Sequence, residues 1–123
     1  MAIFKDRGLI ILIKQLKEAD KLVILWSPNK GRLALLAKGA NKIKSRKSSS
    51  LDLLNLINFS AYGSKSEFEL LTEVSLEDDF KHLKEDLAGI SVSFYILEVL
   101  GKFINSNQSY ENFFDFVTTD LNY

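Results

Sequence analysis

The first 75 residues alternate between short apolar runs and turn-forming residues, and the rest of the chain does not. Each run is rich in Ile, Leu and Val and has the length of a β-strand. The five runs are Leu9–Leu16, Lys21–Trp26, Arg32–Lys38, Leu53–Ala61 and Glu67–Val74. The pattern therefore predicts five strands, and a chain of 123 residues has room for one ordinary domain built around them.

The connections between the runs differ in length. Ser27-Pro28-Asn29-Lys30-Gly31 joins the second and third runs. Pro presets a turn and Asn and Gly tolerate positive φ, so this segment predicts a hairpin. The segment from Gly39 to Ser50 has no sustained apolar pattern and predicts a long exposed loop. The last run alternates, which predicts that Phe68, Leu70, Thr72 and Val74 share one face of a strand.

Five strands with a long connection between the third and the fourth are typical of an OB-type barrel, a five-stranded, partly open Greek-key barrel. Such barrels often grip single-stranded nucleic acid on one face. An SH3-like barrel has a similar number of strands, so the pattern leaves both folds open.

After Val74 the apolar period changes to that of a helix. Ser75-Leu76-Glu77-Asp78 predicts a helix cap. Apolar residues then recur at three- and four-residue steps and predict one buried stripe of Phe80, Leu83, Leu87, Ile90, Phe94, Leu97 and Ile104. Residues 110–121 predict a second amphipathic helix. We therefore expect an OB-fold nucleic-acid-binding domain at residues 1–75 and a helical segment at 76–123. The helices either pack on the barrel or begin a larger helical domain.

Charge is divided sharply along the chain. Up to Ser50 there are twelve Lys and Arg against three Asp and Glu, a net of +9, and from Leu51 on there are four against thirteen, a net of −9. The formal net charge of zero conceals this split. An asymmetry of this size suggests that the basic half binds a polyanion, most often nucleic acid.

Basic residues are densest in the loop after the third predicted strand. Side chains there can neutralise phosphates and release counterions, and Gly39 allows a close backbone approach. Four more cations extend the patch if their strands face the same way: Arg32, Lys30, Lys14 and Lys17. The predicted DNA-binding residues of this region are Arg32, Lys38, Gly39, Lys42, Lys44, Arg46 and Lys47. A solvated loop without a ligand is the alternative.

Single-strand binders also use aromatic side chains on which bases stack. Trp26, Phe59 and Phe68 lie in apolar strands, where core packing is the favoured interpretation. Tyr62 stands next to Gly63 in a turn and is the predicted stacking residue.

Nothing in the sequence indicates catalysis, so we expect a protein that is not an enzyme. His82 is the only histidine and falls in a helical pattern, there is no cysteine, and there is no phosphate-binding loop motif. No cofactor and no metal site are predicted. No apolar run is long enough to span a bilayer, and the absence of cysteine fits a cytoplasmic location.

Several short segments, in order, resemble the N-terminal part of the bacterial RecO recombination-mediator proteins. They are Glu18-Ala19-Asp20-Lys21-Leu22-Val23, Gly31-Arg32-Leu33, Lys38-Gly39-Ala40, Ser45-Arg46 and Leu97-Glu98-Val99. The resemblance covers Gly8 to about Ile104. It departs from the family in length, since this chain is about half as long as a usual member.

The resemblance implies an N-terminal OB fold and the start of a helical domain. It also implies a non-enzymatic role in DNA repair and homologous recombination: binding single- and double-stranded DNA, annealing strands, and helping to load a recombinase. The partners it implies are RecR and the C-terminal tail of single-strand-binding protein (SSB). Two other hypotheses stay open: a protein-interaction module whose helical hairpin and basic loop dock a partner, and an RNA-binding OB fold.

Overall fold

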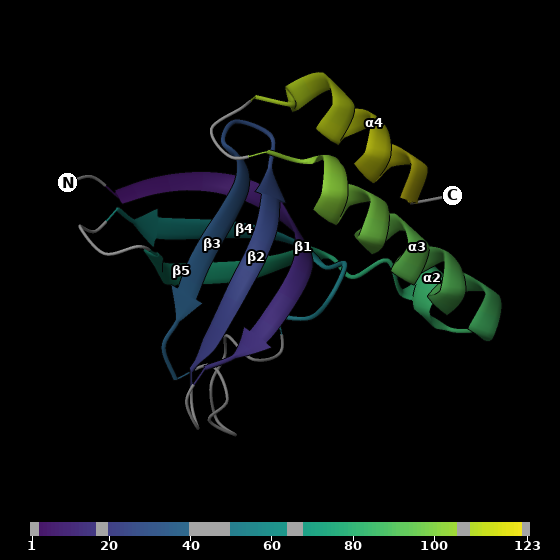
Figure 1. Ribbon diagram of the computed structural model, residues 1–123, viewed down its shortest axis with the longest axis horizontal. Coiled ribbons are helices and arrows are strands. Elements are labelled where there is room, and N and C mark those ends of the chain that lie inside the picture. Colours follow the sequence, from purple (N-terminus) through teal and green to yellow (C-terminus); the bar gives the residue numbers. More distant parts are fainter. Residues whose placement is uncertain (1–2, 17–19, 40–49, 64–67, 106–108, 122–123) are drawn as a thin grey trace.

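The computed structural model describes residues 3–16, 20–39, 50–63, 68–105 and 109–121. Five strands form one sheet: β1 (Ile3–Gln15), β2 (Lys21–Ser27), β3 (Gly31–Ala37), β4 (Leu56–Tyr62) and β5 (Glu69–Asp78). The sheet closes on itself in the order β1-β2-β3-β5-β4 (Figure 1). The prediction of five strands followed by helices is therefore confirmed.

Strand β1 lets the ring close because it serves two neighbours. Its first half pairs with β4, from Ile3↔Tyr62 to Leu9↔Leu56, and its second half pairs with β2. An irregularity between Ile10 and Leu12 bends the strand at this change of partner. The ring is completed by β3 and β5, which are parallel and paired at Leu35↔Glu69 and Leu36↔Leu70.

Two apolar cores lie on opposite sides of the sheet. The inner core fills the ring and includes Ile10, Leu25, Leu35, Ile57 and Phe59. The second core lies between the outer face of the sheet and the helices, and it includes Leu9, Trp26, Phe80, Leu100 and Phe114. Trp26 and Phe59 are both buried, as expected for core residues. Both faces of β2 are covered, which explains its uninterrupted apolar sequence.

Three helices follow the ring: α2 (Lys81–Lys84), α3 (Leu87–Phe103) and α4 (Glu111–Leu121). They lie together on one side of the sheet (Figure 1). Asp86 caps the N-terminus of α3, and its side chain accepts a 2.7 Å hydrogen bond from the backbone N–H of Gly89. In the described residues, no helix is long and apolar enough to cross a membrane.

Strand β5 corrects two predictions. It continues to Asp78, so the predicted helix cap at Ser75–Asp78 is wrong. The register against β4 also shifts between Ser60 and Ala61, which places both Leu71 and Val74 against the inner core. The predicted strict alternation therefore fails at Thr72, where the extra residue of a bulge resets the side-chain period.

The predicted helical stripe is only partly buried. Phe80 and Ile104 belong to the second core, and Leu83 and Leu97 pack against it. Leu87 is 79% exposed and Phe94 is 61% exposed, and Ile90 is exposed as well. The chain turns at Phe80 and again between α2 and α3, so the seven residues do not lie along a single helix.

Candidate nucleic-acid interface

Three lysines lie at one end of the ring, where β1 ends, β2 begins and β3 ends; Lys14 and Lys38 are on the outward face, and Lys21, paired with Ala37, is on the inner face. The ladder pairs Gln15 with Lys21 and Lys21 with Ala37. Lys14 directly precedes this row and Lys38 directly follows it. The side chains of Lys14 and Lys38 are exposed and that of Lys21 is half-buried. We call Lys14, Lys21 and Lys38 the basic end.

Asp20 ties the strands of the basic end together. Its carboxylate accepts a 2.9 Å hydrogen bond from the N–H of Gly39, and its carbonyl accepts one of 3.1 Å from the N–H of Leu16. Gly39 has φ 71°, a conformation that glycine adopts at little cost. The N–H of Gly39 is thus already donated within the protein.

Four of the predicted DNA-binding residues, Lys42, Lys44, Arg46 and Lys47, lie outside the described residues. The described chain stops at Gly39 and resumes at Ser50. The basic end is the part of the ring from which that segment departs.

Arg32 and Lys38 lie on the same face of β3 but far apart. Leu33, Leu35 and Ala37 belong to the inner core, so the alternating positions from 32 to 38 face outward. Six residues of strand separate the two cations by about 20 Å. The guanidinium Nη1 of Arg32 donates a 2.9 Å hydrogen bond to the carbonyl of Gly101 on α3. Arg32 therefore belongs to the junction of the sheet with α3 and is not part of the basic end.

A recess of about 530 Å³ opens between the sheet and α3 at this junction. Its lining is mostly apolar, with Arg32 and Glu98 as charged members. The lining residues are Ile11, Leu12, Arg32, Leu53, Phe94, Leu97, Glu98 and Gly101. The carboxylate of Glu98 lies 3.2 Å from the ammonium of Lys102, which offsets its charge. The sequence prediction placed Phe94 in the core and so missed it as a recess residue.

A smaller hollow of about 190 Å³ continues along α3 and shares Leu53, Phe94 and Leu97 with the recess. Lys84 lies at its end, where its ammonium donates a 2.6 Å hydrogen bond to the side-chain oxygen of Asn55. Burial lowers the pKa of Lys84 below its ordinary value of 10.5, although the nearby carboxylate of Asp52 opposes the shift.

The lowered pKa of Lys84 gives a pH-dependent stability. Between the folded pKa and 10.5 the unfolded chain binds more protons than the folded protein, so the free energy of unfolding rises with pH in that window. We expect Lys84→Met to remove this rise. Urea unfolding of both proteins between neutral pH and pH 10.5 measures it, and a wild type–variant difference that is constant with pH would contradict the expectation.

Tyr62 lies at the end of β4 and is half-buried. The ladder pairs Tyr62 with Leu70, and Leu70 with Leu36 of β3. Tyr62 therefore lies level with Leu36, two strands away from β3, and Lys38 follows Leu36 by two residues. Lys30 lies in the turn at the other end of β3, with its ammonium 4.3 Å from the centre of the Phe4 ring.

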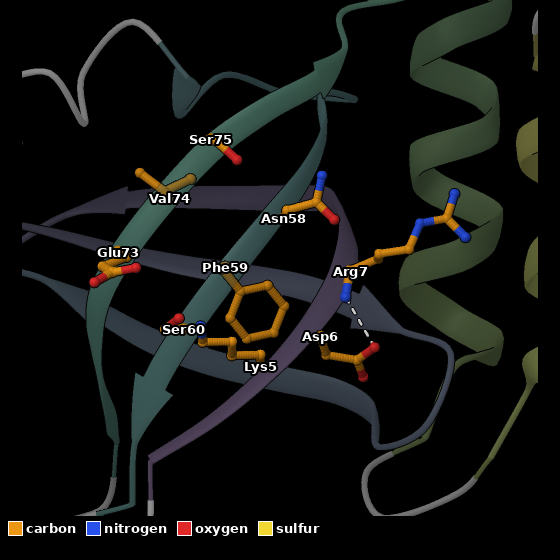
Figure 2. A pocket seen from close by; sticks show the side chains of 9 residues that line it. All are labelled: Lys5, Asp6, Arg7, Asn58, Phe59, Ser60, Glu73, Val74 and Ser75. Atoms are coloured by element: carbon orange, nitrogen blue, oxygen red, sulfur yellow. Dashed lines mark hydrogen bonds between the residues drawn. The ribbon is translucent and has the colours of Figure 1, made fainter.

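A further hollow of about 410 Å³ lies over β1, β4 and β5. Figure 2 shows its nine lining residues, three from each strand, with Arg7 extending toward the helices. The guanidinium of Arg7 donates to both carboxylate oxygens of Glu77, at 2.9 and 3.1 Å, and Glu73 also lines this hollow. Acidic side chains thus accompany its cations, which disfavours a polyanion here.

These features define a small closed β module with a helical cover, which carries Lys14, Lys21 and Lys38 at one end of the ring. Residues 1–80 match the family model described as recombination protein O N terminal. The chain belongs to this family, as the ordered short segments of its sequence predicted.

Curated relatives with the name DNA repair protein RecO support this assignment over nearly the whole chain. The chain is 32% identical to the protein of Clostridium kluyveri over 121 residues, which cover 98% of this chain and 47% of the relative. It is 32% identical to that of Clostridium novyi, covering 95% and 46%. It is 24% identical to that of Symbiobacterium thermophilum, covering 90% and 44%. The chain thus spans about half the length of the curated relatives it matches.

Proposed function

We propose that this protein is a non-enzymatic DNA-binding module of RecO type that acts in DNA repair and homologous recombination. The observation that carries the proposal is the basic end, where three adjacent strands place Lys14, Lys21 and Lys38 at the same end of the ring. Family membership supports the same role, because the relatives are named DNA repair proteins. Phosphate contacts at this end give binding with little sequence preference.

We propose further that the five-stranded ring is an OB-type barrel and not an SH3-like one. OB folds bind oligonucleotides on the face of strands 2 and 3 and at the loop between strands 1 and 2. The basic end lies where β1, β2 and β3 meet, which fits this location. The sequence placed the end of the DNA-binding domain at residue 75, but β5 continues to Asp78, so we propose that this domain spans residues 1–78 and that a helical domain starts after it.

Strand annealing and assistance in recombinase loading are the activities we propose for the module, with single- and double-stranded DNA as ligands. RecR and SSB are the proposed protein partners, and the cytoplasm is the proposed location. These follow from the family resemblance. DNA binding is the one of these proposals that is also argued from residues of this chain.

A salt titration tests DNA binding. We expect wild type to bind a labelled single-stranded oligonucleotide with an affinity that falls as salt rises. In K14A/K21A/K38A the log–log salt slope should become shallower by about 2, because each phosphate contact on a single strand contributes about 0.7. Fluorescence anisotropy at several salt concentrations measures both quantities. A second variant, with Lys42, Lys44, Arg46 and Lys47 changed to Ala, tests the loop.

The matched control is K5A/K30A/K81A, which removes the same charge from exposed lysines away from the basic end. Its slope should stay close to that of wild type. If wild type does not bind at low salt, or if the control and the basic-end variant lose affinity equally, the proposed interface is wrong.

A protein-interaction module is the second candidate function, and one observation favours it. A groove of about 470 Å³ between α3 and α4 is lined almost entirely by apolar side chains, and Tyr95 and Phe113 in it are exposed. Binding of an acidic peptide but of no oligonucleotide would favour this candidate. Tighter binding of RNA than of DNA of the same sequence would favour an RNA-binding OB fold.

A further inference from the structure

Phe94 is an exposed aromatic residue at a place where the fold has both an apolar recess and a cation. Phe94 is 61% exposed although Ile96, Leu97 and Leu100, further along α3, pack in or against the second core. Phe94, Leu97, Glu98 and Gly101 are spaced by three and four residues, so they form one face of α3, and all four line the recess. Phe94 is thus a wall of the recess, and part of its ring is open to solvent.

The other side of the recess is apolar. It is lined by Ile11 and Leu12 of β1 and by Leu53, in the segment before β4. The volume of about 530 Å³ lies in the range of small-ligand sites, and a flat ring fits between an aromatic wall and an aliphatic one. The chemistry of the lining therefore suits a planar, largely apolar group.

The charged residues that line the recess, Arg32 and Glu98, indicate what kind of molecule would carry the planar group. Arg32 uses one N–H on the carbonyl of Gly101, and a guanidinium has five such donors. Glu98 is paired with Lys102, so Arg32 is the cation that a ligand in the recess meets. Lys38 continues the same outward face of β3 toward the basic end. A planar group linked to a chain of anions matches this arrangement.

We propose that Phe94 is a base-stacking residue, and that the recess between α3 and the sheet receives one nucleobase of single-stranded DNA. The phosphates of that strand lie against Arg32 and run along β3 toward the basic end. This inference rests on the proposed function and extends it, because it adds an aromatic contact and a path to an interface otherwise built from lysines. Stacking on an aromatic side chain tolerates any base, which suits binding without sequence preference.

The test compares Phe94→Ala with Phe103→Ala on two oligonucleotides of equal length, oligo-dT and an abasic strand with the same phosphates. Phe103 lies nine residues further along α3, on the opposite side of the helix, and is 70% exposed. We expect Phe94→Ala to weaken oligo-dT binding about 5-fold to 150-fold, the range for losing one stacked base. Binding of the abasic strand should change less than about 2-fold, and Phe103→Ala should behave like wild type on both strands.

Phe94→Trp keeps a stacking surface and should retain most of the oligo-dT affinity. The failure of this inference is distinguishable from the failure of the proposed function. If wild type binds neither strand, the proposed function fails and this inference fails with it. If wild type binds oligo-dT and Phe94→Ala binds it equally well, DNA binding stands and the stacking role of Phe94 is wrong. A loss that is equal on the abasic strand also overturns it, because the lost contact then does not involve a base.

Discussion

Replacing Trp26 with Ala is expected to lower the free energy of unfolding by about 3–5 kcal/mol, the usual cost of deleting a large buried aromatic side chain. Trp26 is fully buried in the second core. Its ring centre lies 4.9 Å from that of Phe114, 5.3 Å from that of Phe113 and 6.2 Å from that of Tyr110. The substitution therefore removes the aromatic contacts that Trp26 of β2 makes with Phe113 and Phe114 of α4. Urea unfolding followed by far-UV circular dichroism measures it.

Trp26→Phe separates packing from hydrogen bonding at the same position. The indole N–H of Trp26 has no hydrogen-bond partner among the described residues, so removing it relieves a desolvation cost. The smaller ring leaves a cavity, and we expect a net loss of about 1–2 kcal/mol. Leu87→Ala, at a side chain that is 79% exposed, should stay within about 0.5 kcal/mol of wild type. A cost below about 1 kcal/mol for Trp26→Ala would show that the helices are held by other contacts.

The hairpin between β2 and β3 was predictable from sequence because its information is local. Pro28 fixes the start of the turn, and Gly31 adopts φ 71°, which other residues avoid. The register follows from the turn, with Ser27 opposite Gly31. Strand β2 is apolar on both faces because the inner core and the helical cover enclose it.

The ends of β1 and β5 were not predictable, because neighbours across the sheet decide them. β1 begins at Ile3, six residues before the apolar run, since charged residues such as Lys5 face outward while Phe4 packs inward. In β5 a bulge reverses the alternation, and no single-strand pattern signals a bulge that depends on pairing with β4.

The candidate site was predicted in part for the same reason. The high density of Lys and Arg near Lys38 predicted a basic region there, and Lys14 was expected to join it if its strand faced the same way. Lys21 was missed because its place beside Ala37 is a matter of register. Phe94 was missed because an exposed and a buried aromatic look alike at helical spacing, and only the packing of α3 on the sheet distinguishes them.

Phe80 leads to a prediction that reverses the ordinary order of Ala and Gly. It is 1% exposed and adopts φ 48° and ψ 45°, a left-handed conformation that costs a residue with a side chain about 1–2 kcal/mol. We expect Phe80→Ala to lower the free energy of unfolding by about 3–5 kcal/mol through the cavity it leaves. Phe80→Gly should cost roughly 0.5–1 kcal/mol less than Phe80→Ala, since relief of this strain exceeds the unfolded-chain entropy of Gly, about 0.4–1 kcal/mol.

At Leu83, inside α2, Gly should instead be the worse replacement by about 1 kcal/mol. Urea unfolding of the four variants measures both differences, and an Ala variant at position 80 more stable than the Gly variant would mean that Phe80 leaves the left-handed region once its ring is removed.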